Sequence, residues 1–319
     1  MSELILEQAS DDLIANEADV YPSRKRQNAK LIGRQDPIVY TSKEQDPPVD
    51  RSLINTYNKQ GFVVLDEVFT PDEVTIFQKE LERLGADQQI QPSGEVITEP
   101  SSNDVRSIFR VHESSLIFKA LAADERLADL ARYLLDDEVY IHQSRLNYKP
   151  GFRGEEFYWH SDFEPWHVED GMPRMRACSM SIILTENFDN NGPLMLIPGS
   201  HKQYLVCEGE TPEDHYLASL KKQEYGVPSD DSLKTLAAQS GIVSATGKPG
   251  SVVVFDCNVM HGSNGNITPF PRSSAFFVYN ALSNKVVNPF CAQAPRPEHI
   301  CSREYIHPVQ RSQGCKLNA

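Results

Sequence analysis

Two histidines and an aspartate have the residue types and the spacing of a metal-binding triad. His160 and Asp162 are separated by one residue, and side chains at i and i+2 of an extended strand point to the same face. His261 follows in a second strand-like run. Two imidazoles and one carboxylate on one face of a metal leave coordination positions open, and this set is diagnostic of non-haem Fe(II) oxygenases.

A short H-x-D motif also arises by chance, so its surroundings must decide between a metal site and a coincidence. Aromatic residues flank the first two ligands within Phe157–Phe163, and a turn at Gly250 leads into an apolar strand that ends at His261. Arg272 opens the next strand, where its guanidinium could form a bidentate pair with a carboxylate of a metal-bound co-substrate. This arrangement favours a 2-oxoglutarate oxygenase.

The composition argues against several classes of function. A chain of 319 residues can form one large β domain or two smaller ones. The net charge of -14 and the pI of about 5.1 oppose binding to nucleic acid. The sequence shows no secretory signal pattern and no apolar run long enough to span a membrane, and its six cysteines lack C-x-x-C spacing. We therefore expect a soluble cytoplasmic protein with reduced thiols.

The first third of the chain has helical signals after a polar start. Residues 1–50 are expected to form a polar arm with little core of its own, with the basic run Arg24–Arg26 in solvent. Thr70 and Glu73 have the pattern of a capping box at the start of a helix. A further helical stretch is predicted over 115–136.

The pattern changes to β from residue 138 onward. Strands are expected at about 139–148, 157–162, 176–186, 193–198, 251–257 and 273–283. Residues 51–319 are therefore predicted to be a single mainly β domain with flanking helices (α+β), built on a double-stranded β-helix or jelly-roll core. The long polar segment 199–249 is expected to be a lid-like insertion.

Three polar residues, Gln143, Arg145 and Asn147, share one face of the strand predicted at 139–148. A solvated outer face of the sheet would explain this spacing. If the strand instead lines the barrel beside the metal, the same side chains become binding groups.

A second set of candidate ligands, His167, Glu169 and Asp170, could combine with His160. These residues lie between Pro165 and a glycine, in an expected loop. We expect them to lie behind the site or at the surface.

With the triad and Arg272 in place, the chain resembles the phytanoyl-CoA dioxygenase-like superfamily of Fe(II)/2-oxoglutarate enzymes, from about residue 57 to residue 308. Within that superfamily, its blocks Phe157–Pro173, Asp256–Asn264 and Asn266–Arg272 resemble the ectoine hydroxylase family. Pro165 stands where the family pattern has threonine.

The resemblance implies a role for individual residues. Fe(II) would be held by His160, Asp162 and His261. The co-substrate 2-oxoglutarate would be held by Arg272, together with Arg145, Asn147, Ser181 and Ser263. The substrate ectoine would be contacted by Gln143, Trp166 and Arg296. The resemblance also implies O2 as second co-substrate, succinate and CO2 as co-products, and a cytoplasmic homodimer.

Two other functions fit parts of the same pattern. Another hydroxylase of the superfamily, acting on a different small polar metabolite, would share the triad and Arg272. A non-catalytic metal-binding jelly roll would use the triad structurally, but structural metal sites are usually coordinatively closed, and Arg272 would have no task. The carboxylate ligand Asp162 favours hydroxylation, since related halogenases carry a small residue there.

Overall fold

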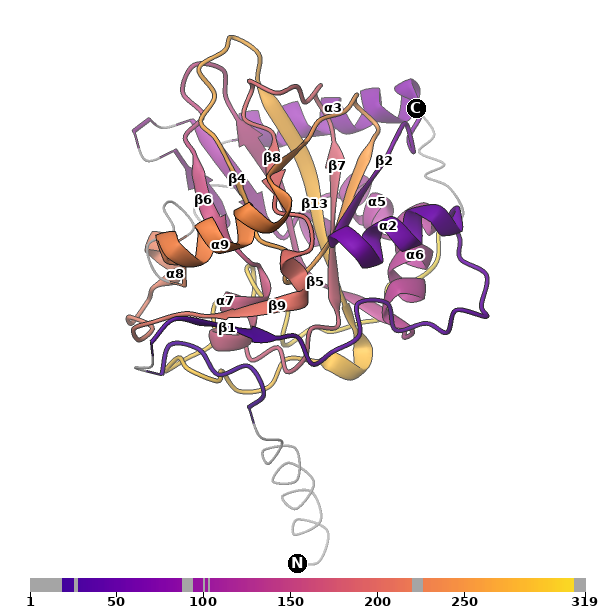
Figure 1. The fold of residues 1–319 in the computed structure, drawn as a ribbon. Coiled ribbons are helices and arrows are strands. Elements are labelled where there is room, and N and C mark those ends of the chain that lie inside the picture. The colour runs from indigo at the N-terminus through magenta and orange to yellow at the C-terminus, as the bar shows by residue number, and fades with distance from the viewer. Residues whose placement is uncertain are drawn as a thin grey trace, which may run out of the picture.

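The structure is a computed structural model that describes residues 19–25, 28–87, 94–99, 101–102, 104–219 and 226–312 (Figure 1). Within these residues the strands form a large sheet, a small sheet and one two-stranded ribbon, and all the paired strands are antiparallel. No helix of the described segments combines the length and the apolar character that a membrane span requires.

The large sheet contains, in spatial order, β2 (Phe62–Leu65), β11 (Val252–Asp256), β7 (Ala177–Ile183), β13 (Arg272–Ala281), β5 (Val139–Lys149), β4 (Val105–Phe109) and β3 (Val96–Thr98). The small sheet contains β10 (Val243–Ala245), β8 (Leu194–Leu196), β12 (His261–Ser263) and β6 (Phe157–His160). The ribbon pairs β1 (Lys30–Gly33) with β9 (Gln203–Val206).

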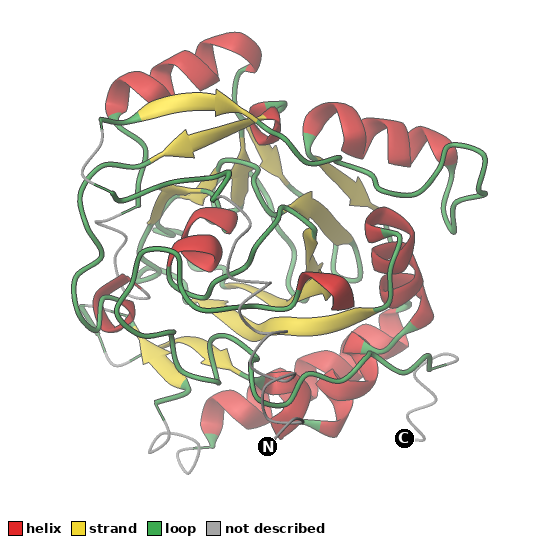
Figure 2. Ribbon diagram, turned by 90° about the horizontal axis from the view of Figure 1, so that it is seen from below, coloured by secondary structure: helices red, strands yellow, loops and turns green. Residues whose placement is uncertain are grey.

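The helices are mostly short. They are α2 (Arg51–Gln60), α3 (Pro71–Ala86), α4 (Val111–Ser114), α5 (Leu116–Ala122), α6 (Glu125–Leu135), α7 (Phe163–Val168), α8 (Tyr216–Ser219) and α9 (Asp230–Ser240), with 3-10 turns at η2 (Ser200–Lys202) and η3 (Leu282–Asn284). Figure 2 shows the longer helices at the periphery of the strand layers. The predicted capping box is present, since Thr70 accepts from the backbone of Glu73 and the Glu73 side chain accepts from the backbone of Thr70.

The two faces of the large sheet have different partners because side chains alternate along each strand. On β13, Ala275, Phe277 and Tyr279 join the core that also contains the apolar side chains of α2, α3, α5 and α6. Phe276 and Val278, on the opposite face, join a second core with residues of β8, β11 and α7. An antiparallel sheet with helices on one face and a smaller sheet on the other confirms the predicted jelly-roll core with flanking helices.

The polar face predicted for β5 points inward. Arg145 pairs in register with Phe276, and Asn147 pairs with Ser274, so both lie on the inner face of the large sheet. The alternative of a solvated outer face is therefore wrong for this strand.

The segment before residue 50 differs from expectation. β1 pairs with β9, Tyr21 is buried against Phe163, and Arg24 is 0% exposed. The predicted solvent exposure of the basic run is thus wrong for Arg24. Residues 1–18 of the expected arm lie outside the described residues, as do residues 220–225 of the expected insertion 199–249 and residues 313–319. That the insertion acts as a lid, and that 51–319 is a single domain, stay predictions.

Candidate active site

His160, Asp162 and His261 converge at one edge of the small sheet. His160 ends β6 and His261 begins β12, and the two residues are direct partners in the antiparallel ladder. Their ring centroids lie 4.2 Å apart. Oδ1 of Asp162 lies 3.7 Å from Nε2 of His160 and 3.8 Å from Nε2 of His261. The three ligand atoms therefore surround one point, and all three residues are buried.

Backbone carbonyls orient both imidazoles. Nδ1 of His160 lies 2.7 Å from the carbonyl oxygen of Tyr158, and Nδ1 of His261 lies 3.0 Å from that of Val259. A carbonyl oxygen can only accept, so Nδ1 is the donor in each ring and Nε2 keeps its lone pair toward Asp162. Burial lowers the pKa of His160 well below its ordinary value, and the neighbouring His261 lowers it further. Two imidazoles and one carboxylate fit a divalent iron site.

Asp162 reaches this point by a different route from the predicted one. β6 ends at His160, and Asp162 has helical backbone angles (φ -65°, ψ -34°) as the residue before α7. The expectation that His160 and Asp162 share one face of a strand is therefore wrong. Phe163 donates its backbone N–H to the carbonyl of Cys257 (2.8 Å), which holds this turn against the end of β11.

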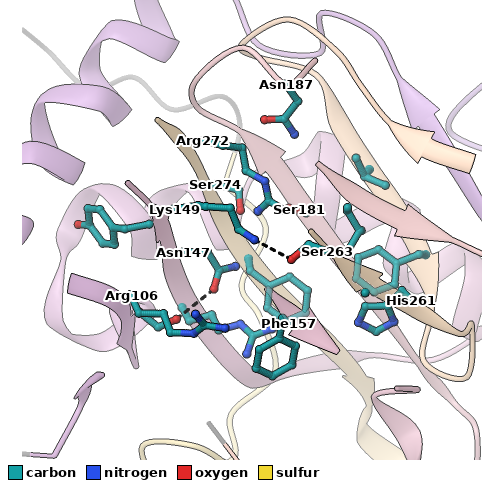
Figure 3. A pocket seen from close by; sticks show the side chains of 18 of the residues that line it. Arg106, Asn147, Lys149, Phe157, Ser181, Asn187, His261, Ser263, Arg272 and Ser274 are labelled. Carbon is teal, nitrogen blue, oxygen red and sulfur yellow. Dashed lines mark hydrogen bonds between the residues drawn. The ribbon is translucent and has the colours of Figure 1, made fainter. Parts of the chain in front are cut away.

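A cavity opens beside the two histidines, between the large and small sheets. Figure 3 shows Asn147, Lys149, Arg272 and Ser274 reaching into it from β5 and β13, with Ser263 on the opposite side. Lys149 donates to Ser263 Oγ (3.0 Å), which links the two sheets across the cavity.

The cavity walls carry an excess of buried positive charge. Burial, with the neighbouring charges of Arg145 and Arg106, lowers the pKa of Arg272 to about 10. Burial, followed by the charges of Arg272 and Arg106, lowers the pKa of Lys149 to about 6. The carboxylate of Glu99 on the wall pairs with Arg106. A buried site of this composition is suited to an anion with more than one carboxylate.

Four polar atoms of the wall lack hydrogen-bond partners among the described residues. Nε of Arg145 and Oγ of Ser274 are potential donors, and Oε1 of Glu99 and Oδ1 of Asn187 are acceptors. The Arg145 guanidinium stacks over Phe276, with its Cζ 4.6 Å from the ring centroid. Because buried polar groups are normally paired, these atoms mark positions where a ligand would complete the hydrogen bonding.

The predicted co-substrate residues all lie together. Arg272, Arg145, Asn147, Ser181 and Ser263 line this cavity with His160 and His261. The structure thus brings the proposed iron ligands and the proposed 2-oxoglutarate residues to one place.

The residues predicted to contact ectoine do not line this cavity. Gln143 donates to the carbonyl of Ile300 (2.8 Å), and Arg296 forms a bidentate ion pair with Asp170. The Trp166 ring packs edge-on against His142 at 5.3 Å. These three residues form a second cluster, next to the C-terminal segment.

The second set of candidate ligands is buried but separate from His160. α7 occupies the expected loop, and His167, Glu169 and Asp170 are each less than 4% exposed. His167 contacts the Met172 carbonyl and Asp19, whereas Glu169 and Asp170 pair with arginines. Of the two expected positions, behind the site or at the surface, the surface is therefore wrong, because these side chains are buried and have partners from other segments.

Sequence reasoning missed several cavity residues, among them Lys149, Ser274 and Arg106. Lys149 follows Asn147 by two positions and Ser274 follows Arg272 by two, so the strand period that placed their neighbours could also have placed them. Arg106 lies on β4, for which no strand was predicted, and no signal pointed to it.

Comparison with known proteins identifies the family of the chain. The family model "Phytanoyl-CoA dioxygenase (PhyH)" matches residues 57–274. An ectoine dioxygenase from Sphingopyxis alaskensis is 59% identical over 285 residues, covering 89% of this chain and 93% of that protein.

Two solved structures are similar over nearly the whole chain. The crystal structure of EctD from S. alaskensis with 2-oxoglutarate and 5-hydroxyectoine has a TM-score of 0.85 and 52% identity over the structural alignment, which covers 93% of this chain and 99% of that one. The structure of the same protein with bound Fe has a TM-score of 0.84 and 51% identity at the same coverage.

Replacing any one of the three candidate ligands should remove the metal. We expect His160→Ala, Asp162→Ala and His261→Ala to lose bound iron and turnover, because three protein ligands hold the ion on one face only. Iron content per chain, measured after reconstitution and desalting, checks this expectation. His307→Ala, which changes an exposed histidine, is the control and should retain iron. A triad variant with full iron content would show that its residue is not a ligand.

Proposed function

The chain belongs to the phytanoyl-CoA dioxygenase family, and on that premise we propose that it hydroxylates ectoine to 5-hydroxyectoine with Fe(II), 2-oxoglutarate and O2. One oxygen atom enters ectoine and the other enters succinate, while the C1 carboxylate of 2-oxoglutarate leaves as CO2. The observation that carries the proposal is the buried cationic cavity with unpartnered donors, directly beside the histidines of the triad.

In this proposal His160, Asp162 and His261 hold the iron. When bound, Fe(II) supplies the redox chemistry with O2 that no side chain of the protein can perform. The protein provides the ligand orientation. The carbonyls of Tyr158 and Val259 fix both imidazoles, and Ser179 donates to the second oxygen of Asp162 (3.4 Å).

Arg272 binds the carboxylate of 2-oxoglutarate that lies away from the metal. Its Nε is occupied by the carbonyl of Gly192 (3.0 Å), which fixes the plane of the guanidinium and leaves its terminal nitrogens for the ligand. Arg145, Asn147, Ser181 and Ser263 complete the binding site. The dianion compensates the local excess of positive charge when it binds. The cavity therefore favours a dicarboxylate over an uncharged acid.

The ectoine site lies on the other side of Asp162. Gln143 pairs with Val278, which pairs with Ser179, and Ser179 contacts Asp162. Trp166 donates its backbone N–H to the Asp162 carbonyl (3.3 Å). These contacts support the proposal that Gln143 and Trp166 act beside Asp162, and neither residue lines the cationic cavity.

The chemistry of ectoine matches these groups. Its delocalised amidinium ring can stack on the indole of Trp166, a contact of about 0.5–2 kcal/mol. Gln143 offers an amide to the ring nitrogens. Arg296 uses Nε and Nη2 for Asp170, and its Nη1 has no partner in the described part of the chain, so it can bind the ectoine carboxylate.

The proposal includes the setting of the reaction. A cytoplasmic homodimer that makes a compatible solute under osmotic stress is what the family resemblance implies. The acidic surface, with a net charge of -14, suits a protein that works at high salt.

A product assay tests the substrate. Wild-type protein incubated with Fe(II), 2-oxoglutarate and ectoine should yield a product that is one oxygen heavier than ectoine, with succinate in equal amount. Mass spectrometry of the reaction measures both. Oxidation of another small polar metabolite, with ectoine unchanged, would leave the oxygenase assignment in place and refute the substrate.

Arg272→Ala should weaken the co-substrate far more than the substrate. Losing a charge-assisted pair typically costs about 2–5 kcal/mol when the other charge stays buried, or a factor of roughly 30 or more. We expect the KM for 2-oxoglutarate to rise by that factor and the KM for ectoine to change little. Arg153→Ala removes an exposed arginine and should leave both constants unchanged. An unchanged KM for 2-oxoglutarate in Arg272→Ala would assign the role to Arg145 instead.

A further inference from the structure

Helix α7 connects the metal site to the proposed ectoine site. It begins directly after Asp162 and carries Trp166. Three carboxylates lie on it or just beyond it, on Glu164, Glu169 and Asp170, and all three are buried. Buried carboxylates this close together require cationic partners, and the structure supplies those partners from outside the helix.

Arg24 is the cationic partner of these carboxylates on one side of α7. Its Nε and Nη2 bind the two oxygens of Glu164 at 3.0 and 2.6 Å, and its Nη1 binds Glu169 at 2.7 Å and Thr211 Oγ1 at 3.3 Å. Burial opposes the charge on Arg24, but Glu164 and Glu169 raise its pKa above the ordinary value. The Ser23 hydroxyl donates to Oε1 of Glu164 (2.7 Å), the oxygen that Nε of Arg24 also binds. The guanidinium is thus fully engaged and fully buried.

The backbone of Arg24 is held as firmly as its side chain. Its N–H donates to the Cys207 carbonyl (3.0 Å), and its carbonyl accepts from Cys291 Sγ (2.9 Å). Its φ of 55° lies in the left-handed region, which a non-glycine residue keeps only when its surroundings enforce it. A Cβ on Gly226 would come within 2.3 Å of Arg24 Nη2, so the insertion also packs closely against the guanidinium.

Arg24 therefore joins three distant parts of the chain around α7. These are the N-terminal segment, the insertion with the end of β9, and the segment near Cys291. Figure 1 shows α7 beside β1 and β9 at one end of the molecule. The ring of Phe163 at the start of α7 contacts Tyr204 of β9, with centroids 5.9 Å apart.

Arg296 is the partner on the other side. Its bidentate pair with Asp170 comes from the C-terminal segment, and Nε2 of His142 lies 3.3 Å from the same carboxylate. His142, Asp170 and Cys301 include the ligand types of a metal site. Because Arg296 occupies both oxygens of Asp170, we interpret this group as an ion-pair network. His142 lies beside this network without a hydrogen-bond partner for its ring nitrogens among the described residues, and it packs against the Trp166 ring.

We propose that Arg24 is a positioning residue for the hydroxylation, acting through α7 to hold Trp166 and the substrate at the metal site. The inference rests on the proposed function, since it assigns Trp166 to the substrate. Productive oxidation requires the substrate to be held close to its reactive geometry, and a displacement of about 1 Å can cost roughly 100-fold in rate. A loosened α7 should therefore reduce coupled turnover while the 2-oxoglutarate cavity stays intact.

The expected signature is uncoupling. When substrate is misplaced, 2-oxoglutarate is still decarboxylated to succinate and CO2. The second oxygen atom then leaves as water, with the two electrons supplied by ascorbate in the assay. The ratio of succinate to hydroxylated product reports this directly, and a change in stability alone would not alter it.

Arg24→Lys is the test variant because it keeps the charge and loses the bidentate geometry. Wild type should form succinate and hydroxylated product in equal amounts. In Arg24→Lys we expect coupled turnover to fall about tenfold, succinate to exceed product several-fold, and the KM for 2-oxoglutarate to stay within about twofold. Arg126→Gln, which breaks an ion pair with Glu73 and Asp124 in the outer helical layer, is the control and should stay coupled.

A second measurement is independent of turnover. The chain has two tryptophans, Trp159 and Trp166, so in a Trp159→Phe background the tryptophan fluorescence comes from Trp166 alone, which is 2% exposed. Quenching by acrylamide should be slight in that background and clearly stronger when Arg24→Lys is added. The Arg126→Gln control should not change it.

Each result of these two experiments either supports or contradicts the positioning role of Arg24. Equal succinate and product in Arg24→Lys, with Trp166 still protected, would show that Arg24 does not position the site. If Arg24→Lys does not fold, Glu164→Gln removes the same bidentate pair while Glu169 still balances Arg24, and it should uncouple in the same way. If wild type leaves ectoine unchanged, the substrate assignment fails, whereas the quenching experiment still tests the link from Arg24 to Trp166.

Discussion

The pairing of β6 with β12 is the contact on which the site depends. It sets His160 opposite His261 in one antiparallel ladder, at the spacing that two ligands of one ion require. A shift of one residue in this register would turn one imidazole to the other face of the small sheet. The neighbouring strand β8 pairs with the other edge of β12, with His261 opposite Leu196. The register irregularity after His261 lies in the pairing of β12 with β6.

The inner face of the large sheet carries the second requirement of the site, which is charge. Arg145 and Arg272 lie on adjacent strands with their partners in register, so their positions follow from the pairing of β5 with β13. Burying several cations beside one another is unfavourable without anions. The protein retains them next to a metal triad, and a bound dicarboxylate would balance them. The buried charges that would bind a dicarboxylate are thus also the charges whose burial is unfavourable.

Short-range patterns in the sequence were sufficient for part of this picture. The residue types and their spacing predict the triad and Arg272. Strand alternation leaves two orientations open for the polar face of β5, and the pairing of β5 with β13 decides for the inward one. The helical conformation of Asp162 was not predicted, because an H-x-D motif is equally compatible with a strand. The hydrogen bond from Phe163 to Cys257, which holds the turn, joins residues far apart in the sequence. The burial of Arg24 was unpredictable for a similar reason. Its partner Glu164 lies 140 residues away, and a basic run near a polar terminus looks solvated when read alone.

A crystal structure grown without oxygen, with Fe(II) and 2-oxoglutarate, tests the central claim most directly. The account predicts iron bound by Nε2 of His160, Nε2 of His261 and a carboxylate oxygen of Asp162. It also predicts that the distant carboxylate of 2-oxoglutarate is bound by Arg272, with Arg145 Nε and Ser274 Oγ acquiring hydrogen-bond partners. Iron at another group, or 2-oxoglutarate bound away from Arg272 and Arg145, would contradict it.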